Sequence, residues 1–436
     1  MKKTLHVIYC TVFFAICLVP VLVMAMGLDA GKAAEKRELA PFPTSIGTEL
    51  PKEFGDWFSD HFGLRTQLVT GDAWYKYKLG YSTGDKVVVG RGEWLYFAET
   101  MPDYYRQSPM TDRELSILCE TLDLIHSHFA RQGVDFYFMA APNKNTVYPE
   151  FMPLFVRPGD GLSDLSRLTA ALSGRAYYLA AAIPPHGEGQ VPLYHKRDSH
   201  WNNLGARIIY NQLMDKLAAG EAYDTYLDVV PVAVQNFQGD LDDMLLPALD
   251  MRDADYDFGI ETRYKSRRQI TDRMAMQITT TSEVNGRRVV FFRDSFFNNL
   301  IPFFSNNLGG ADYRRAIPYP MQDVTAENFD AAVIEIAERN LRNVMSKTPV
   351  FPADEVILPD GVMGMKFDLD VTERGGLICL SGRLVADPDS VHEVYVVHGG
   401  RAYRAFRFDE DGGEGFSLYL DSGGYNPGDP VSLWVK

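Results

Sequence analysis

The chain has 436 residues, 46% of them hydrophobic and 23% charged, which is typical of a globular protein and excludes general disorder. At about 100 to 200 residues per domain, this length predicts two to three domains. The formal net charge of −15 argues against a nucleic acid partner, because phosphate neutralisation requires a basic surface. Four cysteines are too few for a disulfide-stabilised scaffold.

The N-terminus predicts export. Lys2 and Lys3 precede an almost wholly apolar stretch from Leu5 to Met26, whose length is near the roughly 20 residues that span a bilayer. Residues 1–27 therefore fit a cleaved signal peptide or an uncleaved membrane anchor. In both cases the positive start stays in the cytoplasm. We expect a periplasmic protein, anchored to the inner membrane if the leader is uncleaved.

The segment 28–45 has no sustained apolar face and predicts a tether. Within the folded body, Thr111 and Glu114 have the spacing of a capping box at the start of a helix, and Gly133 is placed to end it. An apolar strand follows directly. This order of helix and buried strand is typical of an α/β domain.

Three apolar strands are predicted in this domain, at residues 134–141, 289–292 and 331–336. Each runs into a polar segment, and amphipathic helical segments separate them. The simplest account is a short parallel sheet flanked by helices in a domain spanning residues 46–345.

The pattern changes at the C-terminus. Prolines interrupt residues 346–364, which predict a linker, and residues 365–436 carry short β-like runs between turns. A small all-β module, expected to be a β-sandwich, follows from this pattern. Its aromatic residues are candidates either for a glycan-binding face or for the core.

Asp198 and His200 lie just before an amphipathic helix that Asn202 or Asn203 is placed to cap. In an extended turn, side chains two positions apart share a face. Asp198 is therefore able to accept a hydrogen bond from His200 and to prepare it as a general base. A structural histidine or a metal ligand explains the pair equally well.

Ser295 follows the strand at 289–292, where a helix is predicted to begin. Ligands of α/β sheets bind at the carboxyl ends of the strands, and free backbone N–H groups there stabilise an oxyanion. A nucleophile suits this position, although an N-cap serine is the ordinary alternative.

Taken together, these motifs resemble the SGNH-hydrolase-like polysaccharide O-acetyltransferases of the alginate AlgX/AlgJ type. The resemblance covers roughly residues 45 to 345 and rests on short segments that occur in the family's order. The segments are Val88–Tyr96, Pro142–Pro149, Asp198–Trp201, Gly239–Leu241, Arg293–Ser295 and Glu338–Arg339.

The resemblance implies that Ser295 is the nucleophile, His200 the base and Asp198 the orienting acid. Arg293 stands where ordinary SGNH hydrolases have glycine, which leaves the oxyanion geometry open.

Arg293 and three further residues are candidates for binding substrate or the oxyanion. Asn143 and Lys144 follow a strand, where a solvated loop is the alternative. Trp201 offers a sugar-stacking face, with core packing as its alternative.

The function implied is an exported O-acetyltransferase that acetylates an exopolysaccharide through an acetyl-serine intermediate. No P-loop or dinucleotide motif is present, and we expect neither a metal nor a cofactor, the acetyl donor being a substrate. The resemblance further suggests a membrane-bound O-acyltransferase partner as the acetyl source. An acetyl-esterase with the same triad and a non-catalytic glycan-binding assembly factor are the alternatives.

Overall fold

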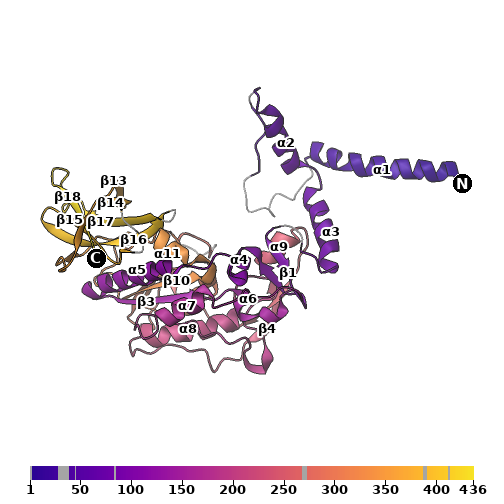
Figure 1. The fold of residues 1–436 in the computed structure, drawn as a ribbon. Coiled ribbons are helices and arrows are strands. Elements are labelled where there is room, and N and C mark those ends of the chain that lie inside the picture. The colour runs from indigo at the N-terminus through magenta and orange to yellow at the C-terminus, as the bar shows by residue number, and fades with distance from the viewer. Residues whose placement is uncertain are drawn as a thin grey trace.

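The computed structural model describes residues 2–27, 39–44, 46–82, 85–267, 273–385, 390–410 and 413–436. Most of the predicted tether, residues 28–38 and 45, lies outside these ranges. Figure 1 shows a central α/β domain with strands of a second sheet at one end and the first three helices projecting at the other.

The central sheet has the order β3-β10-β8-β9-β7-β6, and its first four strands are parallel. The three predicted strands are present and adjacent, as β3 (Asp135–Ala141), β10 (Ala331–Ala337) and β8 (Arg288–Phe292). In register, Ile334 of β10 pairs with Phe292 of β8 and with Phe138 of β3. The carboxyl ends of these strands therefore meet at one edge of the sheet.

Helices cover both faces of this sheet. The apolar stripe of α5 (Asp112–Arg131) packs on one face with α7 (Asp164–Ala171) and α11 (Arg342–Ser346). On the other face lie α8 (Asn203–Leu217) and α10 (Ile301–Asn307). Burial on both faces explains why the central strands read as continuous apolar runs.

The capping box predicted for α5 is present: Thr111 Oγ1 accepts from the Glu114 N–H, and Glu114 Oε2 accepts from the Thr111 N–H. Gly133 ends the segment with φ of 72°, a left-handed conformation that glycine adopts without steric cost.

The sheet is mixed and not purely parallel. The sequence pattern missed β9 (Gly310–Arg314), β7 (Gln277–Thr281) and β6 (Lys265–Ser266), of which β7 runs antiparallel to its neighbours. Their sequences are polar because they lie toward one edge, where β9 buries an ion pair between Asp312 and Arg314 at 2.9 Å. Strands of this kind carry little hydrophobic signal.

Short elements complete the central domain. They are β1 (Val87–Val89), β2 (Leu95–Phe97), α4 (Met101–Tyr105), α6 (Lys144–Val147), β4 (Val232–Phe237), α9 (Asp240–Leu245) and β5 (Asp253–Asp257), with 3₁₀ turns at Ala98–Thr100, Pro149–Phe151, Glu188–Gln190, Ser295–Asn299 and Glu338–Asn340.

The C-terminal strands form a separate antiparallel sheet, which confirms the prediction of an all-β module. The long strand β16 (Arg401–Glu410) joins the two halves of this sheet, because β15 pairs with its beginning and β17 with its end. The strands are β11 (Glu355–Val356), β12 (Met363–Met365), β13 (Asp370–Arg374), β14 (Leu377–Arg383), β15 (Val394–His398), β16, β17 (Gly413–Asp421) and β18 (Val431–Val435). Both halves contribute to one apolar core. The predicted linker 346–364 includes β11, which pairs with β16, and the beginning of β12, which pairs with β18.

The module packs against α5 through charged side chains. Arg407, 3% exposed, donates to Glu414 at 2.7 Å and to Glu120 of α5 at 3.3 Å. Arg113 at the start of α5 donates to the same Glu414 at 2.6 Å. Buried charges require partners of opposite charge. These ion pairs therefore hold the module against α5.

Three helices precede the central domain: α1 (Lys2–Ala25), α2 (Leu50–His61) and α3 (Arg65–Lys78). Within the described part of the chain, α1 alone is long and apolar enough to cross a membrane, over Lys3–Ala25. This agrees with the predicted signal peptide or anchor.

Candidate active site

The structure brings Ser295, His200 and Asp198 together. The Nε2 atom of His200 lies 2.8 Å from Oγ of Ser295. On the other side of the ring, Nδ1 lies 2.6 Å from Oδ1 of Asp198. A serine, a histidine and a carboxylate in this order have the geometry of an activated nucleophile.

Two elements position these side chains. His200 lies in the loop before α8, whose N-cap is Asn202, accepting from the N–H groups of Leu204 and Gly205. Ser295 opens the 3₁₀ turn after β8, where the side chain of Asp294 accepts from the N–H of Phe296. The structure thus decides between the two predicted caps of α8 in favour of Asn202.

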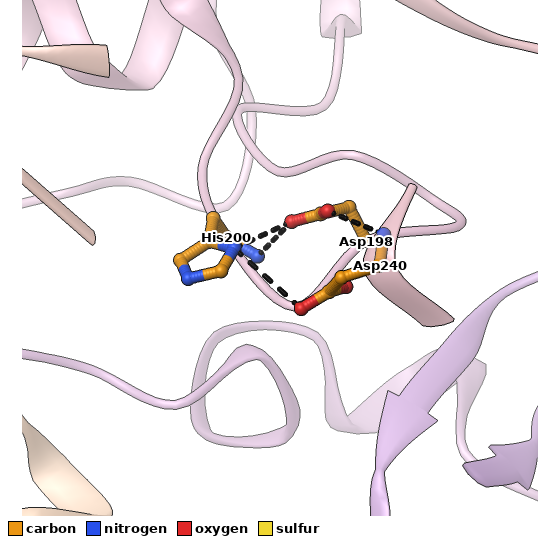
Figure 2. A group of neighbouring side chains, drawn as sticks. All are labelled: Asp198, His200 and Asp240. Carbon is orange, nitrogen blue, oxygen red and sulfur yellow. Dashed lines mark hydrogen bonds and ion pairs between the residues drawn. The ribbon is translucent and has the colours of Figure 1, made fainter. Parts of the chain in front are cut away.

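Asp198 is held by more than the histidine. Its Oδ1 also accepts from the backbone N–H of His200, and its Oδ2 accepts from the N–H of Asp240, both at 2.8 Å. Asp240 lies behind the ring, with Oδ2 at 3.9 Å from Nδ1 of His200. Figure 2 shows the two carboxylates on the same side of the imidazole. These contacts fix the ring orientation that a general base requires.

The carboxylates also set the charge of the histidine. Burial opposes a charged imidazole, but Asp198 outweighs it and raises the pKa of His200 above its usual value. Burial likewise acts to raise the pKa of Asp198, yet the adjacent histidine holds it well below the ordinary range. For Asp240, burial and the charge of Asp198 raise the pKa to about 6.

The same three residues offer ligand atoms within 4.8 Å of one another, so a metal ion has to be considered. Their lone pairs and N–H groups are already committed: Nδ1 and Nε2 of His200 to Asp198 and Ser295, and both oxygens of Asp198 to N–H groups. A metal would have to replace these bonds. The cluster fits proton transfer better than metal binding.

Lys144 lies outside the reacting groups. Its side chain is buried, and Nζ donates to the carbonyl oxygens of Leu95, Lys196 and Asp198 at 2.7, 2.7 and 2.9 Å. Three acceptors match the three N–H groups of an ammonium. Lys144 therefore joins β2 to the loop that carries Asp198, and in this structure it is neither solvated nor directed at a ligand.

Asn143 is also buried, with its N–H bonded to Glu338 at 2.8 Å and its side chain to Asp103 at 3.3 Å. Trp201 is fully buried and packs edge-on against Phe296 at 4.9 Å. Both contacts are internal to the protein. For Trp201 the structure shows the core packing that was the alternative to sugar stacking.

Arg293 is buried beside Ser295, but its guanidinium donates to the carbonyl oxygens of Arg273 and Ala275 at 2.7 and 3.2 Å and to Asn298 at 2.7 Å. Burial lowers its pKa to about 10. These partners hold the segment at 273–275 against the turn that carries Ser295. Its guanidinium is thus engaged within the protein.

Two residues near the site received no role from the sequence, although each lay in a segment that resembled the family. Asp240 is the second carboxylate described above. The guanidinium of Arg339, in the turn after β10, lies over the rings of Phe97 and Phe296 at 5.4 and 5.6 Å, and its charge acts against protonation of His200. In the sequence, Asp240 follows a glycine and Arg339 follows a buried strand, and these positions were the signals that could have indicated a role for them.

Residues 87–269 match the family described as SGNH hydrolase-like domain, acetyltransferase AlgX. The resemblance inferred from the motifs is thereby confirmed over this segment, which is similar to the SGNH hydrolase-like domain of that acetyltransferase family. The matched segment includes Asp198, His200 and Asp240 and ends before Ser295. No curated protein shows significant similarity to the chain.

Solved structures show partial likeness to the fold. The O-acetyltransferase domain of Pseudomonas putida AlgJ is 18% identical in sequence, with a TM-score of 0.39. The alignment covers 59% of this chain and 92% of the AlgJ chain. Bacillus cereus PatB1 is 15% identical, covering 59% of this chain and 97% of its own, with a TM-score of 0.42. Pseudomonas aeruginosa AlgX is 14% identical, covering 80% of this chain and 90% of its own, with a TM-score of 0.37.

Proposed function

We propose that the protein is an exported O-acetyltransferase that acetylates an exopolysaccharide through an acetyl-Ser295 intermediate. The observation that carries the proposal is the contact of His200 with both Ser295 Oγ and Asp198. The family match over residues 87–269 supports the acyl chemistry. The apolar helix α1 supports export to the periplasm.

In the first half-reaction, His200 Nε2 takes the proton of Ser295 as Oγ attacks the acetyl carbonyl carbon. Asp198 stabilises the imidazolium that forms. The backbone N–H of Ser295, which has no acceptor among the described residues, is available to the developing oxyanion. The proton then passes from His200 to the departing donor oxygen, and acetyl-Ser295 remains.

In the second half-reaction, His200 takes the proton of a sugar hydroxyl, whose oxygen attacks the acetyl carbon and displaces Ser295. The proton returns to Oγ. No cofactor enters these steps, because the acetyl donor is a substrate. A membrane-bound O-acyltransferase would supply the acetyl group, and the exopolysaccharide would receive it.

The test uses 4-nitrophenyl acetate with the full chain. The wild-type protein should release nitrophenol and gain the mass of one acetyl group on the peptide that contains Ser295. Ser295→Ala and His200→Ala should do neither while keeping the wild-type thermal midpoint. Ser422→Ala, at an exposed serine, is the matched control.

Addition of exopolysaccharide oligosaccharides then separates the alternatives. Acetylated glycan supports the transferase, whereas free acetate at an unchanged rate supports the acetyl-esterase. If Ser295→Ala restores polymer acetylation in a deletion strain as well as the wild type does, the protein is a non-catalytic glycan-binding factor.

A further inference from the structure

Helix α3 has two apolar faces. Thr70, Ala73 and Tyr77 are buried, and the latter two pack in one apolar cluster with β1, β2 and α9 of the central domain. On the opposite side, Leu68, Tyr75 and Leu79 follow one line along the helix and are 52%, 62% and 55% exposed. A helix on the surface of a globular domain needs only one apolar face. The second face is therefore unexplained by folding.

Helix α2 adds to this surface. It contains no buried residue, yet Phe54, Trp57 and Phe58 lie on one side of it. These aromatic side chains line a cavity of about 500 Å³ together with Val21 and Met24 of α1. The apolar side of α2 is thus continuous with the end of the helix that is able to span a membrane.

The junction between α2 and α3 touches α1 directly. A Cβ atom added to Gly63 would lie 2.0 Å from the carbonyl oxygen of Pro20 and 2.8 Å from the N atom of Met24. Figure 1 shows that one end of α1 lies beside the junction of α2 and α3 and that α1 extends from there to the side away from the central domain. Because the buried face of α3 points to the domain, the line of Leu68, Tyr75 and Leu79 points away from it, to the α1 side.

We propose that α2 and α3 lie on the outer surface of the membrane that α1 enters, with their exposed apolar side chains in the interfacial layer of the phospholipids. A spanning α1 places α2 and α3 along the plane of the bilayer at its periplasmic end. Trp57 and Tyr75 suit this depth, since tryptophan and tyrosine favour the membrane interface. Trp74, 45% exposed, lies at the flank of α3, between this line and the buried face.

The positions of two lysines also agree with a phospholipid surface. At 100° per residue, Lys76 and Lys78 lie on either side of the line of exposed apolar residues. Lys76 is paired with Asp72 of the same helix at 2.7 Å. Lys78 is able to place its ammonium among the phosphate groups while its stem covers apolar surface. The two helices would hold the catalytic domain at a constant height above the membrane. This inference is independent of the proposed acetyl transfer.

The test measures tryptophan fluorescence of the full chain in liposomes of phosphatidylethanolamine and phosphatidylglycerol. Brominated acyl chains near the headgroups should quench the emission, and Trp57→Phe with Trp74→Phe should remove most of that quenching. Trp434→Phe, in the C-terminal module, is the matched control and should retain it. Trp94 and Trp201 are buried and should remain unquenched.

A second variant tests the surface without changing a fluorophore. Leu68→Glu with Leu79→Glu alters exposed side chains, so folding should persist, and quenching of the tryptophan emission should fall because α3 no longer settles in the interface. Lys86→Glu, at an exposed position on the domain, should leave it unchanged. Equal emission in brominated and plain liposomes, with insertion of α1 verified by flotation, would overturn the proposal and leave a protein partner for this surface.

Discussion

The backbone N–H of Asp240 donates to Oδ2 of Asp198 at 2.8 Å, while its carboxylate lies 3.9 Å from Nδ1 of His200. One residue of α9 therefore both fixes the orienting acid and adds a second negative charge behind the base. Ser199 in turn bonds both oxygens of Asp240, at 2.9 and 2.7 Å. The histidine thus faces a carboxylate pair with unequal proton affinities.

Asp240→Asn should shift the pH dependence of kcat/KM. The base must be neutral to accept the proton of Ser295, so activity rises as pH passes the raised pKa of His200. Asp240, with a pKa of about 6, is ionised above that pH and raises the pKa of the histidine. Loss of its charge should move the acidic limb to lower pH by about one unit.

Asp243→Asn, on the same helix, is the control for that profile and should leave it unchanged. An acidic limb of Asp240→Asn that coincides with the wild type would show that the second carboxylate has no electrostatic role. Asp198→Asn should have a larger effect, a loss of kcat on the order of 10³ to 10⁴, because it permits the wrong tautomer of the ring.

Gly239→Ala should impair the site through sterics alone. The φ of Gly239 is −80°, which alanine adopts readily, but an added Cβ would lie 2.1 Å from the carbonyl oxygen of Arg197. The chain must move apart there, and the bond from Asp240 to Asp198 lengthens. We expect kcat/KM to fall about 10-fold or more and unfolding to become easier by about 1 to 3 kcal/mol. Gly423→Ala, with open space around it, should behave as wild type.

Lys144→Met should destabilise the protein and not only its activity. It removes the donor for three carbonyl groups, of Leu95, Lys196 and Asp198, at a buried position. The carbonyl of Lys196 keeps the N–H of Leu95 at 2.8 Å, so those of Leu95 and Asp198 lose their donor. Unsatisfied buried acceptors cost about 1 to 3 kcal/mol each before relaxation, so urea unfolding should show a loss of about 2 kcal/mol or more. Lys86→Met, at an exposed lysine, should unfold as wild type does. An unchanged midpoint for Lys144→Met would contradict this structural role of the lysine.

Arg407→Met should weaken the contact between the C-terminal module and α5. It leaves Glu414 with Arg113 at 2.6 Å and Glu120 with Arg404 at 2.8 Å as their remaining arginine partners. The cost should therefore lie below the roughly 3 to 5 kcal/mol of an unpaired buried charge, at about 1 to 3 kcal/mol. Arg401→Met on the same strand is the control, because its ion pair with Glu355 is exposed at 3.9 Å and worth at most about 1 kcal/mol. Calorimetry of the full chain checks both values.

Glycan binding by this module is better tested by point substitutions than by deletion of the module. Deletion would expose α5 and leave its charged side chains without their partners in the module. Tyr395, Tyr403, Phe406 and Tyr419 are buried, whereas Tyr425 and Trp434 are partly exposed. If the module holds glycan, Tyr425→Ala with Trp434→Ala should lower transfer to long polysaccharide and spare 4-nitrophenyl acetate. Unchanged transfer to polymer would leave the module a structural role.

Much of the fold was predictable because the signals are local. The capping box at Thr111 and Glu114, the apolar leader and the three central strands follow from propensity and periodicity within short windows. The polar strands β9, β7 and β6 were not predicted, because their pairing depends on neighbours distant in the chain. Their side chains form an ion pair in β9 and hydrogen bonds from β7 to Asp312 instead of an apolar pattern.

The sequence by itself determined the residue types of the site and their order: Asp198 two residues before His200, and Ser295 after a buried strand. It also indicated a class of chemistry, since a nucleophile and a base are recognisable as types. Only the tertiary structure decided which groups meet. Lys144, Trp201 and Arg293 are engaged inside the protein, and Asp240 stands behind the histidine, because hydrogen-bond partners are set by where the chain returns in space and not by spacing along it.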